Sequence, residues 1–270
     1  MLLYNNHFLP EQDLKLSITS RAFQYNDGFF ETIMVLKGRL RFWQDHVERM
    51  REAAAALRLE LPSIFFSVEF EEQLLELARQ CHTLAFGRIK LKVWRAGAGL
   101  YTPQTNEIEW LATAQAATSL PEDPIRVGVC QGITTLFSPL SHFKGPNAPL
   151  YVLAGVEKQE RGIDDLVLLN RQQIVAELIS SNLFWIRDNV LYTPALDTGC
   201  VNGILRRNIL RYCQTAGIKV REAYFPVDKV QQADAAFSVN VTGLRPISFI
   251  EGIAMPTNHP FISQLQDTLL

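Results

Sequence analysis

The stretch that decides the fold runs from Glu177 to Arg206 and reads ELISSNLFWIRDNVLYTPALDTGCVNGILR. Apolar, β-forming residues fill QIVAELIS and LFWIRDN, and NVLYTP resumes this composition after the polar turn Arg187-Asp188-Asn189. Runs of this composition between polar turns are typical of strands. The stretch therefore predicts successive β-strands, with Glu177 on the first of them.

A helix is expected after a loop that ends at Cys200. In GILRRNILRYCQ, Leu205, Ile209 and Cys213 recur at i, i+4 and i+8, the spacing of one buried helix face. Gly203 lies where this helix begins, and the N–H groups at a helix start carry partial positive charge and bind phosphate well. A glutamate on a strand upstream of a phosphate site suggests a ligand with a basic nitrogen at one end and a phosphate at the other. Pyridoxal phosphate fits that description.

The spacing E-x-I-x-x-N-L-F, L-x-T and V-x-G-I-x-R resembles the signature of the class-IV aminotransferases, the fold-type IV pyridoxal-phosphate enzymes. This family includes branched-chain aminotransferase, D-amino-acid aminotransferase and aminodeoxychorismate lyase. The resemblance implies that Glu177 faces the pyridine nitrogen, and that residues near the helix start bind the cofactor. The matching positions are Glu177, Ile179, Asn182, Leu183, Phe184, Leu191, Thr193, Val201, Gly203, Ile204 and Arg206, and Leu205 joins Asn182, Gly203 and Ile204 as a predicted cofactor contact.

The composition is that of an ordinary globular enzyme. Of 270 residues, 47% are hydrophobic and 20% are charged, and the net charge of −2 gives no indication of a nucleic-acid or membrane partner. No apolar run reaches membrane-spanning length, and the first residues lack the basic start of a signal peptide. Four scattered cysteines and five histidines have no metal spacing. We therefore expect a cytoplasmic protein without a metal site.

The first half of the chain predicts a small α/β unit. FETIMVL and RLRFW read as a hairpin around Lys37-Gly38, Asp45 as the N-cap of a helix, residues 67–81 as a second helix, and GRIKLKVWRAG and EIEWLATAQAA as further strands. The loop RAFQYNDGFFET resembles the family segment R-x-x-x-Y-G-D-G-x-F-E-T. Asn26 replaces its first glycine, and asparagine tolerates left-handed backbone better than most residues. Tyr25 in this loop is a candidate substrate contact.

A second family pattern, H-x-x-R-L, occurs here as His46-Val47-Glu48-Arg49-Met50. The resemblance implies that Arg49 reaches the cofactor phosphate. The planar fork of a guanidinium suits that role because it pairs phosphate oxygens bidentately.

Lys144 ends an irregular segment just before a helix expected from about Ala148 to Arg161. The resemblance identifies it as the lysine that bonds the cofactor covalently. The amine of such a lysine must be largely neutral, so its pKa must fall from about 10.4 toward roughly 7–8. With Glu177, Lys144 is the predicted catalytic residue.

The end of the chain offers a second phosphate contact. We expect a strand over AAFSVNVTGLRPISFIEG. The loop that follows this strand in the family usually has G-T or N-S, and here it reads Asn240-Val241-Thr242-Gly243, with Asn240 a candidate substrate contact. Val241 cannot donate a hydroxyl, so Thr242 is the candidate for this contact.

The resemblance covers nearly the whole chain and implies an α/β fold of fold-type IV, like that of D-amino-acid aminotransferase. A small N-terminal α/β domain, 1–119, would be followed by a linker within AATSLPEDPIRV and a larger C-terminal pseudo-barrel domain, 124–270, with the cofactor between them. It also implies a homodimer that acts on a small amine or amino acid.

Three functions remain open. RAFQYNDGFFET, NVLYTPALDTGCVNGILR and Asn240 favour 4-amino-4-deoxychorismate lyase, which expels pyruvate to give 4-aminobenzoate in folate synthesis. The lyase pattern R-G-x-G-G-R-G-Y has Leu100 near its second arginine, and Pro149 displaces a leucine or tyrosine after the lysine. Both keep open a branched-chain or D-amino-acid aminotransferase. In a lyase, Arg95 or Arg245 would replace the missing arginine as the partner of the substrate carboxylate. The third is a binding protein that keeps the fold without turnover.

Overall fold

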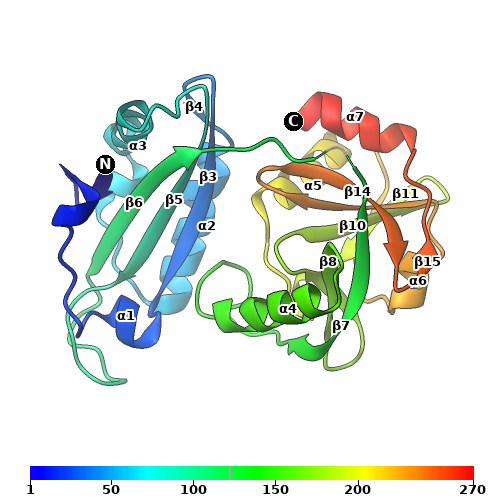
Figure 1. Ribbon diagram of the computed structural model, residues 1–270, viewed down its shortest axis with the longest axis horizontal. Coiled ribbons are helices and arrows are strands. Elements are labelled where there is room, and N and C mark those ends of the chain that lie inside the picture. The colour runs from blue at the N-terminus through cyan, green and yellow to red at the C-terminus, as the bar shows by residue number, and fades with distance from the viewer. Residues whose placement is uncertain (122) are drawn as a thin grey trace. The chain divides into compact units, whose positions relative to one another are not determined.

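The computed structural model describes residues 1–121 and 123–270, and Glu122, in the predicted linker, lies outside them. The chain forms two compact units (Figure 1). The first contains Met1–Ser119 together with the short segment Phe143–Pro146, and the second contains Leu120–His142 and Asn147–Leu270.

The first unit is built on a six-stranded antiparallel sheet in the order β2-β1-β6-β5-β3-β4. The longest strands, β3, β5 and β6, pair over most of their length because alternating apolar residues such as Ile89, Leu91 and Val93 are buried on one face. The predicted hairpin turn at Lys37-Gly38 is confirmed, and both residues have positive φ. The strands are β1 (Leu2–Tyr4), β2 (His7–Leu9), β3 (Gly28–Leu36), β4 (Arg39–Leu40), β5 (Phe86–Arg95) and β6 (Ile108–Ala116).

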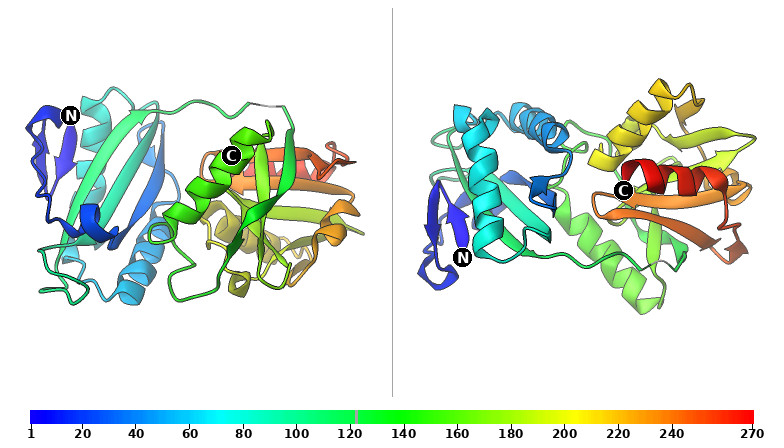
Figure 2. Two further views of the ribbon diagram at one scale, coloured as in Figure 1. Left: turned by 60° about the horizontal axis from the view of Figure 1, so that its bottom comes forward. Right: turned by 90° about the horizontal axis from the view of Figure 1, so that it is seen from above.

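Two helices, α2 (Trp43–Leu57) and α3 (Val68–Gln80), cover one face of this sheet (Figure 2). Aromatic contacts hold this layer together: the ring of Phe70 in α3 lies 6.0 Å from that of Trp43 in α2 and 5.1 Å from that of Trp110 in β6. The predicted N-cap at Asp45 is wrong. Phe42 is the capping residue, with left-handed backbone at φ 54°, so the helix begins three residues earlier and Asp45 lies in its first turn.

The segment before β3 was expected to be a loop but contains a short helix, α1 (Arg21–Tyr25). It ends at Asn26, whose φ of 51° confirms the predicted left-handed backbone. Short 3₁₀ turns also occur at Glu11–Asp13 and Ser63–Phe66.

The second unit is a strongly curved nine-stranded sheet in the order β12-β11-β10-β13-β14-β7-β8-β9, with β15 paired to β14. Because β9 also contacts β10, the sheet curls into a half-barrel around an apolar core that includes Val167, Leu183, Trp185 and Ile247. The strands are β7 (Ile125–Thr135), β8 (Asp165–Asn170), β9 (Val175–Leu178), β10 (Asn182–Arg187), β11 (Val190–Pro194), β12 (Val220–Ala223), β13 (Ala235–Asn240), β14 (Gly243–Ile250) and β15 (Ile253–Ala254).

The expectation of one strand over residues 235–252 is wrong, because the chain reverses between β13 and β14. Asn240 forms this turn by accepting the Thr242 N–H through its side-chain oxygen, at 2.9 Å, as asparagine does in tight turns. The helices of this unit are α4 (Ala148–Glu160), α5 (Ile204–Thr215), α6 (Val227–Gln231) and α7 (Pro260–Leu269), of which α7 was not anticipated (Figure 1). Over residues 1–121 and 123–270, no helix is long and apolar enough to cross a membrane.

Candidate active site

The Glu177 carboxylate, a catalytic candidate from the sequence, is deeply buried in the half-barrel of the second unit. Glu177 lies on β9 as predicted and is only 3% exposed. Its Oε1 accepts the Tyr151 hydroxyl at 2.7 Å, and its Oε2 accepts the Val201 N–H at 3.1 Å and the Asn182 amide at 3.4 Å. A buried carboxylate with these neutral donors suits a cationic N–H group.

The start of α5 lies a few residues beyond this contact. Gly203 is its N-cap, with no side-chain cap and no acidic residue in the first turn, so the helix start is suited to an anion. Glycine is required here because a Cβ atom would lie 2.1 Å from the Asn182 side-chain oxygen. Leu205 and Ile209 are buried as predicted.

Two further contacts fix this arrangement. The Asn182 amide donates to the Val201 carbonyl at 2.7 Å, and Thr193 on β11 donates to the Leu183 carbonyl at 2.9 Å. Arg206 is buried and donates to the Pro194 carbonyl at 3.1 Å and to Glu222 at 2.6 Å, which locks α5 to the ends of β11 and β12. The second unit therefore presents a carboxylate and a helix start at fixed positions.

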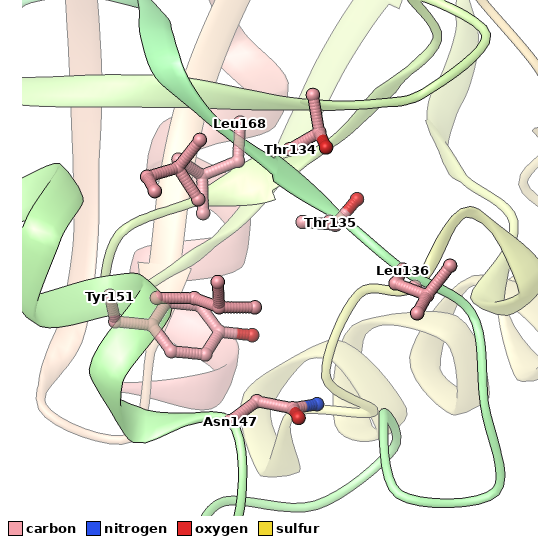
Figure 3. A pocket seen from close by; sticks show the side chains of 9 residues that line it. Thr134, Thr135, Leu136, Asn147, Tyr151 and Leu168 are labelled. Atoms are coloured by element: carbon pink, nitrogen blue, oxygen red, sulfur yellow. The ribbon is translucent and has the colours of Figure 1, made fainter.

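Tyr151 was not anticipated, because nothing in the sequence marks a tyrosine in the first turn of a helix as a partner of a distant strand. Its ring lines a pocket of 10 Å³, space for one water, between α4 and the end of β7. Figure 3 shows the ring between Leu168 and Asn147. Burial and the nearby Glu177 carboxylate raise the pKa of the Tyr151 hydroxyl, so it stays protonated and remains a donor. Burial likewise raises the pKa of the neighbouring Cys200 thiol to about 12.

Lys144 lies in the segment that packs with the first unit. Its carbonyl accepts the Phe30 N–H at 2.9 Å, and the Asn26 amide donates to the Gly145 carbonyl at 2.8 Å. The chain leaves the second unit after His142, whose carbonyl accepts the Asn202 N–H at 3.0 Å. Backbone contacts therefore fix the chain on both sides of Lys144.

Arg49 lies in the first unit, on α2, and is 2% exposed. Its Nε and Nη2 donate to the two carboxylate oxygens of Glu31 on β3, at 2.8 and 2.5 Å. His46 contacts the same carboxylate at 2.7 Å. Burial would raise the pKa of Glu31, but the Arg49 charge and these hydrogen bonds lower it to about 2. Glu31 therefore holds the Arg49 guanidinium in one orientation.

The Arg95 guanidinium forms several hydrogen bonds within the first unit. It donates to Asp27 at 2.9 Å, to Asn106 at 2.5 Å and to the Leu57 carbonyl at 2.6 Å. Arg21 pairs with the same Asp27 at 2.7 Å. Arg95 could bind a substrate carboxylate only by exchanging these partners.

The other predicted residues of the first unit lie near Arg21. Its guanidinium stacks over the Tyr25 ring at 4.9 Å and donates to the Leu100 carbonyl at 2.7 Å. The Leu100 side chain itself is 78% exposed. The Tyr25 ring contacts that of Tyr101, 5.6 Å away.

Thr242 and Asn240 bind each other in the second unit. The Thr242 hydroxyl donates to the Asn240 side-chain oxygen at 2.5 Å, and the Asn240 amide donates to Ser181 Oγ at 3.0 Å. Both side chains therefore stabilise the β13–β14 turn. Among the described residues, no three His, Cys, Asp or Glu side chains are grouped to hold a metal ion.

Comparison with known proteins identifies relatives along most of the chain. The family model of amino-transferase class IV matches residues 28–250. An aminodeoxychorismate lyase from Vibrio harveyi is 31% identical over 259 residues, covering 93% of this chain and 91% of the relative. A D-alanine aminotransferase from Listeria monocytogenes is 28% identical over 272 residues, covering 93% of this chain and 88% of the relative.

The fold is also that of a solved aminotransferase. A branched-chain aminotransferase from Thermoproteus uzoniensis superposes with a TM-score of 0.90 at 22% identity, covering 99% of this chain and 92% of the other. This likeness confirms the predicted fold class, in which mixed α/β elements form a small domain and a half-barrel. Because the family model spans well over half of the sequence, the chain belongs to the amino-transferase class IV family of pyridoxal-phosphate-dependent enzymes.

Proposed function

We propose that this chain binds pyridoxal phosphate and acts as a 4-amino-4-deoxychorismate lyase, eliminating pyruvate to give 4-aminobenzoate for folate synthesis. The observation that carries the cofactor proposal is the buried Glu177 carboxylate beside the uncapped start of α5. An anionic acceptor and a phosphate-binding helix start are the two groups that a pyridine ring with a phosphate arm requires.

Each residue then has a distinct role. Glu177 keeps the ring nitrogen protonated, and the N–H groups of Ile204 and Leu205 bind the phosphate, with Gly203 and Asn182 shaping the cradle. Arg49, oriented by Glu31, is a further proposed phosphate ligand. Thr242 is another, and its hydroxyl would then donate to the phosphate in place of the Asn240 side-chain oxygen. When bound, the cofactor supplies an electron sink for a substrate carbanion.

Lys144 is proposed to bond the cofactor and to move protons at the substrate carbon. Two peptide links separate Lys144 from His142, so their Cα atoms lie at most about 7 Å apart. His142 is hydrogen-bonded to Asn202, the residue before Gly203. This connection along the chain supports Lys144 over the other lysines.

The choice of the lyase reaction is supported by Asn240, by the segments around Tyr25 and Val201, and by the Vibrio harveyi relative. The second candidate is a D-amino-acid or branched-chain aminotransferase. It is favoured by Leu100, which stands near the arginine of the lyase pattern, and by the D-alanine aminotransferase relative.

Product analysis separates these functions. The purified, cofactor-loaded protein is incubated with 4-amino-4-deoxychorismate, and 4-aminobenzoate and pyruvate are measured. The lyase proposal predicts both products in equal amounts. Production of a keto acid and a new amino acid from D-alanine or leucine with 2-oxoglutarate, without 4-aminobenzoate, would establish the aminotransferase instead. Cofactor binding without turnover of any amine would favour a binding protein.

We further propose a homodimer and a cytoplasmic location. The dimer is supported by α4, where Val152, Leu153 and Val156 are 64%, 54% and 46% exposed. A helix that is apolar on nearly every face is normally covered by protein. The location rests on amino-acid composition alone.

A further inference from the structure

A second pocket lies inside the mouth of the half-barrel in the second unit. It has a volume of 180 Å³ and is enclosed by the start of β8, the end of β13, the start of β14 and the turn after β9. This is smaller than the roughly 300 Å³ at which drug-sized ligand pockets begin. Glu177, Asn182 and the start of α5 do not line it. The pocket is therefore separate from Glu177 and the start of α5, although Asn240, the partner of Thr242, lines it. Its size suits a small ligand.

Asp164 and Asp165 supply the negative charge of this pocket, and the Asp164 carboxylate accepts the Arg126 N–H at 2.8 Å. Asp165 is 9% exposed, and its Oδ1 accepts the N–H groups of Leu166 and Ile179, at 2.8 and 3.2 Å. Burial raises the pKa of the Asp165 carboxyl, against the lowering effect of those hydrogen bonds and of the Lys158 and Arg245 charges. An additional cationic partner would stabilise the ionised form.

Lys158 and Arg245 supply the positive charge. Both line the pocket, and among the described residues neither forms an ion pair with Asp165 within 4.0 Å. Arg245 donates through Nη2 to the Asp123 carbonyl at 2.7 Å, whereas its buried Nε has no hydrogen-bond partner. Arg245 therefore lines the pocket as a cation whose charge is not neutralised by a direct ion pair with Asp165.

The remaining polar groups complete a mixed surface. Ser181, Ser238 and Asn240 line the same pocket. Ser238 donates to the Arg245 carbonyl at 3.4 Å, and Ser181 accepts the Asn240 amide, so their hydroxyl oxygens are held in place. Opposite charges at one small pocket exclude a simple anion, which would meet Asp165, and a simple cation, which would meet Lys158 and Arg245.

We infer that this barrel-mouth pocket binds a small zwitterionic amino acid, of the size of alanine, with its ammonium group on Asp165 and its carboxylate on Arg245 and Lys158. The inference is independent of the reaction proposed for the Glu177 site. An amino acid bound here would be a ligand additional to the substrate.

Equilibrium dialysis with radiolabelled alanine tests this inference. Full-length protein freed of cofactor is used, so that no covalent adduct forms with the ligand. We expect Asp165→Asn and Arg245→Gln each to weaken binding at least tenfold, because each leaves one charged end of the ligand without its partner. Arg221→Gln, which changes an exposed arginine outside the pocket, is the matched control and should leave binding unchanged.

Two single-charge probes sharpen the result. Ethylamine keeps only the ammonium group and propionate only the carboxylate, and both should bind at least tenfold more weakly than alanine. Thermal unfolding of each variant shows whether it is folded. If Asp165→Asn does not fold, Arg245→Gln alone tests the inference. Absence of alanine binding to the wild type would overturn the inference. So would unchanged alanine binding by folded variants, or tight binding of propionate alone.

Discussion

The Tyr151 hydroxyl donates a 2.7 Å hydrogen bond to Oε1 of Glu177, and the Val201 N–H donates to Oε2 of the same carboxylate. Tyr151 lies in the first turn of helix α4 and Val201 precedes helix α5, so the carboxylate joins the starts of two helices to strand β9. Glu177 is thus held before any ligand arrives, and its orientation does not depend on the cofactor.

Tyr151→Phe should therefore destabilise the cofactor-free protein. The variant leaves a buried acceptor with one donor fewer, which costs about 1–3 kcal/mol. The free energy of unfolding in urea measures this loss. Tyr224→Phe is the control, because Tyr224 is 56% exposed and its partner Asp197 is solvated, so its effect should be within about 0.5 kcal/mol. Equal losses in the two variants would contradict the structural role of Tyr151.

Glu177→Gln should preserve the fold but remove the anion that we propose faces the ring nitrogen of the cofactor. We expect turnover to fall roughly 100-fold or more, as when a preorganised electrostatic contact is lost from a catalytic site. Steady-state kinetics with the cofactor in excess measures the effect. Glu60→Gln, which changes an exposed glutamate, should retain wild-type kcat. A Glu177→Gln enzyme with wild-type kcat would exclude Glu177 from the chemistry.

Gly203→Ala should weaken cofactor binding. The added methyl group would lie 2.1 Å from the Asn182 side-chain oxygen, so either the helix start or Asn182 must move. Gly155→Ala is the matched control, because nothing lies within 4 Å of a Cβ there and alanine is favoured over glycine inside a helix by about 1 kcal/mol. Cofactor titration should show weaker binding only for Gly203→Ala, and equal affinities would remove α5 from the phosphate site.

Glu31→Gln should destabilise the first unit by about 3–5 kcal/mol, because it leaves the buried charge of Arg49 without its carboxylate. The pKa of Glu31 is lowered from 4.5 to about 2 in the folded chain. Its stabilising effect is therefore fully present above pH 4.5 and is lost as the pH falls toward 2.

Urea unfolding between neutral pH and acid measures this contribution. The difference in unfolding free energy between wild type and Glu31→Gln should shrink as the pH falls below about 4.5. Glu72→Gln, which changes an exposed glutamate, should follow the wild type throughout. A wild-type advantage that does not change between neutral pH and the acid range would refute the ion-pair account.

Val152→Asp should dissociate the proposed homodimer. The substitution places a charge on the exposed apolar face of α4, where burial against a partner would leave that charge unpaired. Light scattering during size-exclusion chromatography should report a dimer for the wild type and a monomer for the variant. Lys219→Asp, which changes an exposed residue outside α4, should leave the molecular mass of the dimer in solution unchanged.

The strands and the helix between residues 177 and 206 could be predicted because their apolar periodicity and turn residues agree with the final packing. The β13–β14 turn could not, since Val241 and Thr242 are β-branched residues typical of strands, and the turn depends on the Asn240 side chain. The start of α2 was misplaced because Phe42, rather than a polar cap, adopts the left-handed conformation.

Partners distant in sequence were beyond prediction for a different reason. The Arg49–Glu31 pair and the Tyr151–Glu177 contact join residues on different elements. Their geometry follows from how helices pack on the sheets, which the periodicity of a single segment does not encode. The residues of the proposed cofactor site could be named from the sequence, whereas the neighbours that orient them could not.

The central claim is that Lys144 holds pyridoxal phosphate, and borohydride reduction followed by peptide mapping tests it most directly. The purified protein should absorb in the visible range as isolated or after reconstitution, lose this absorbance on reduction, and carry the reduced label on Lys144. Lys144→Ala should carry no label, whereas Lys219→Ala should be labelled like the wild type. A label on another lysine, or a protein that cannot be reconstituted with pyridoxal phosphate, would contradict the account.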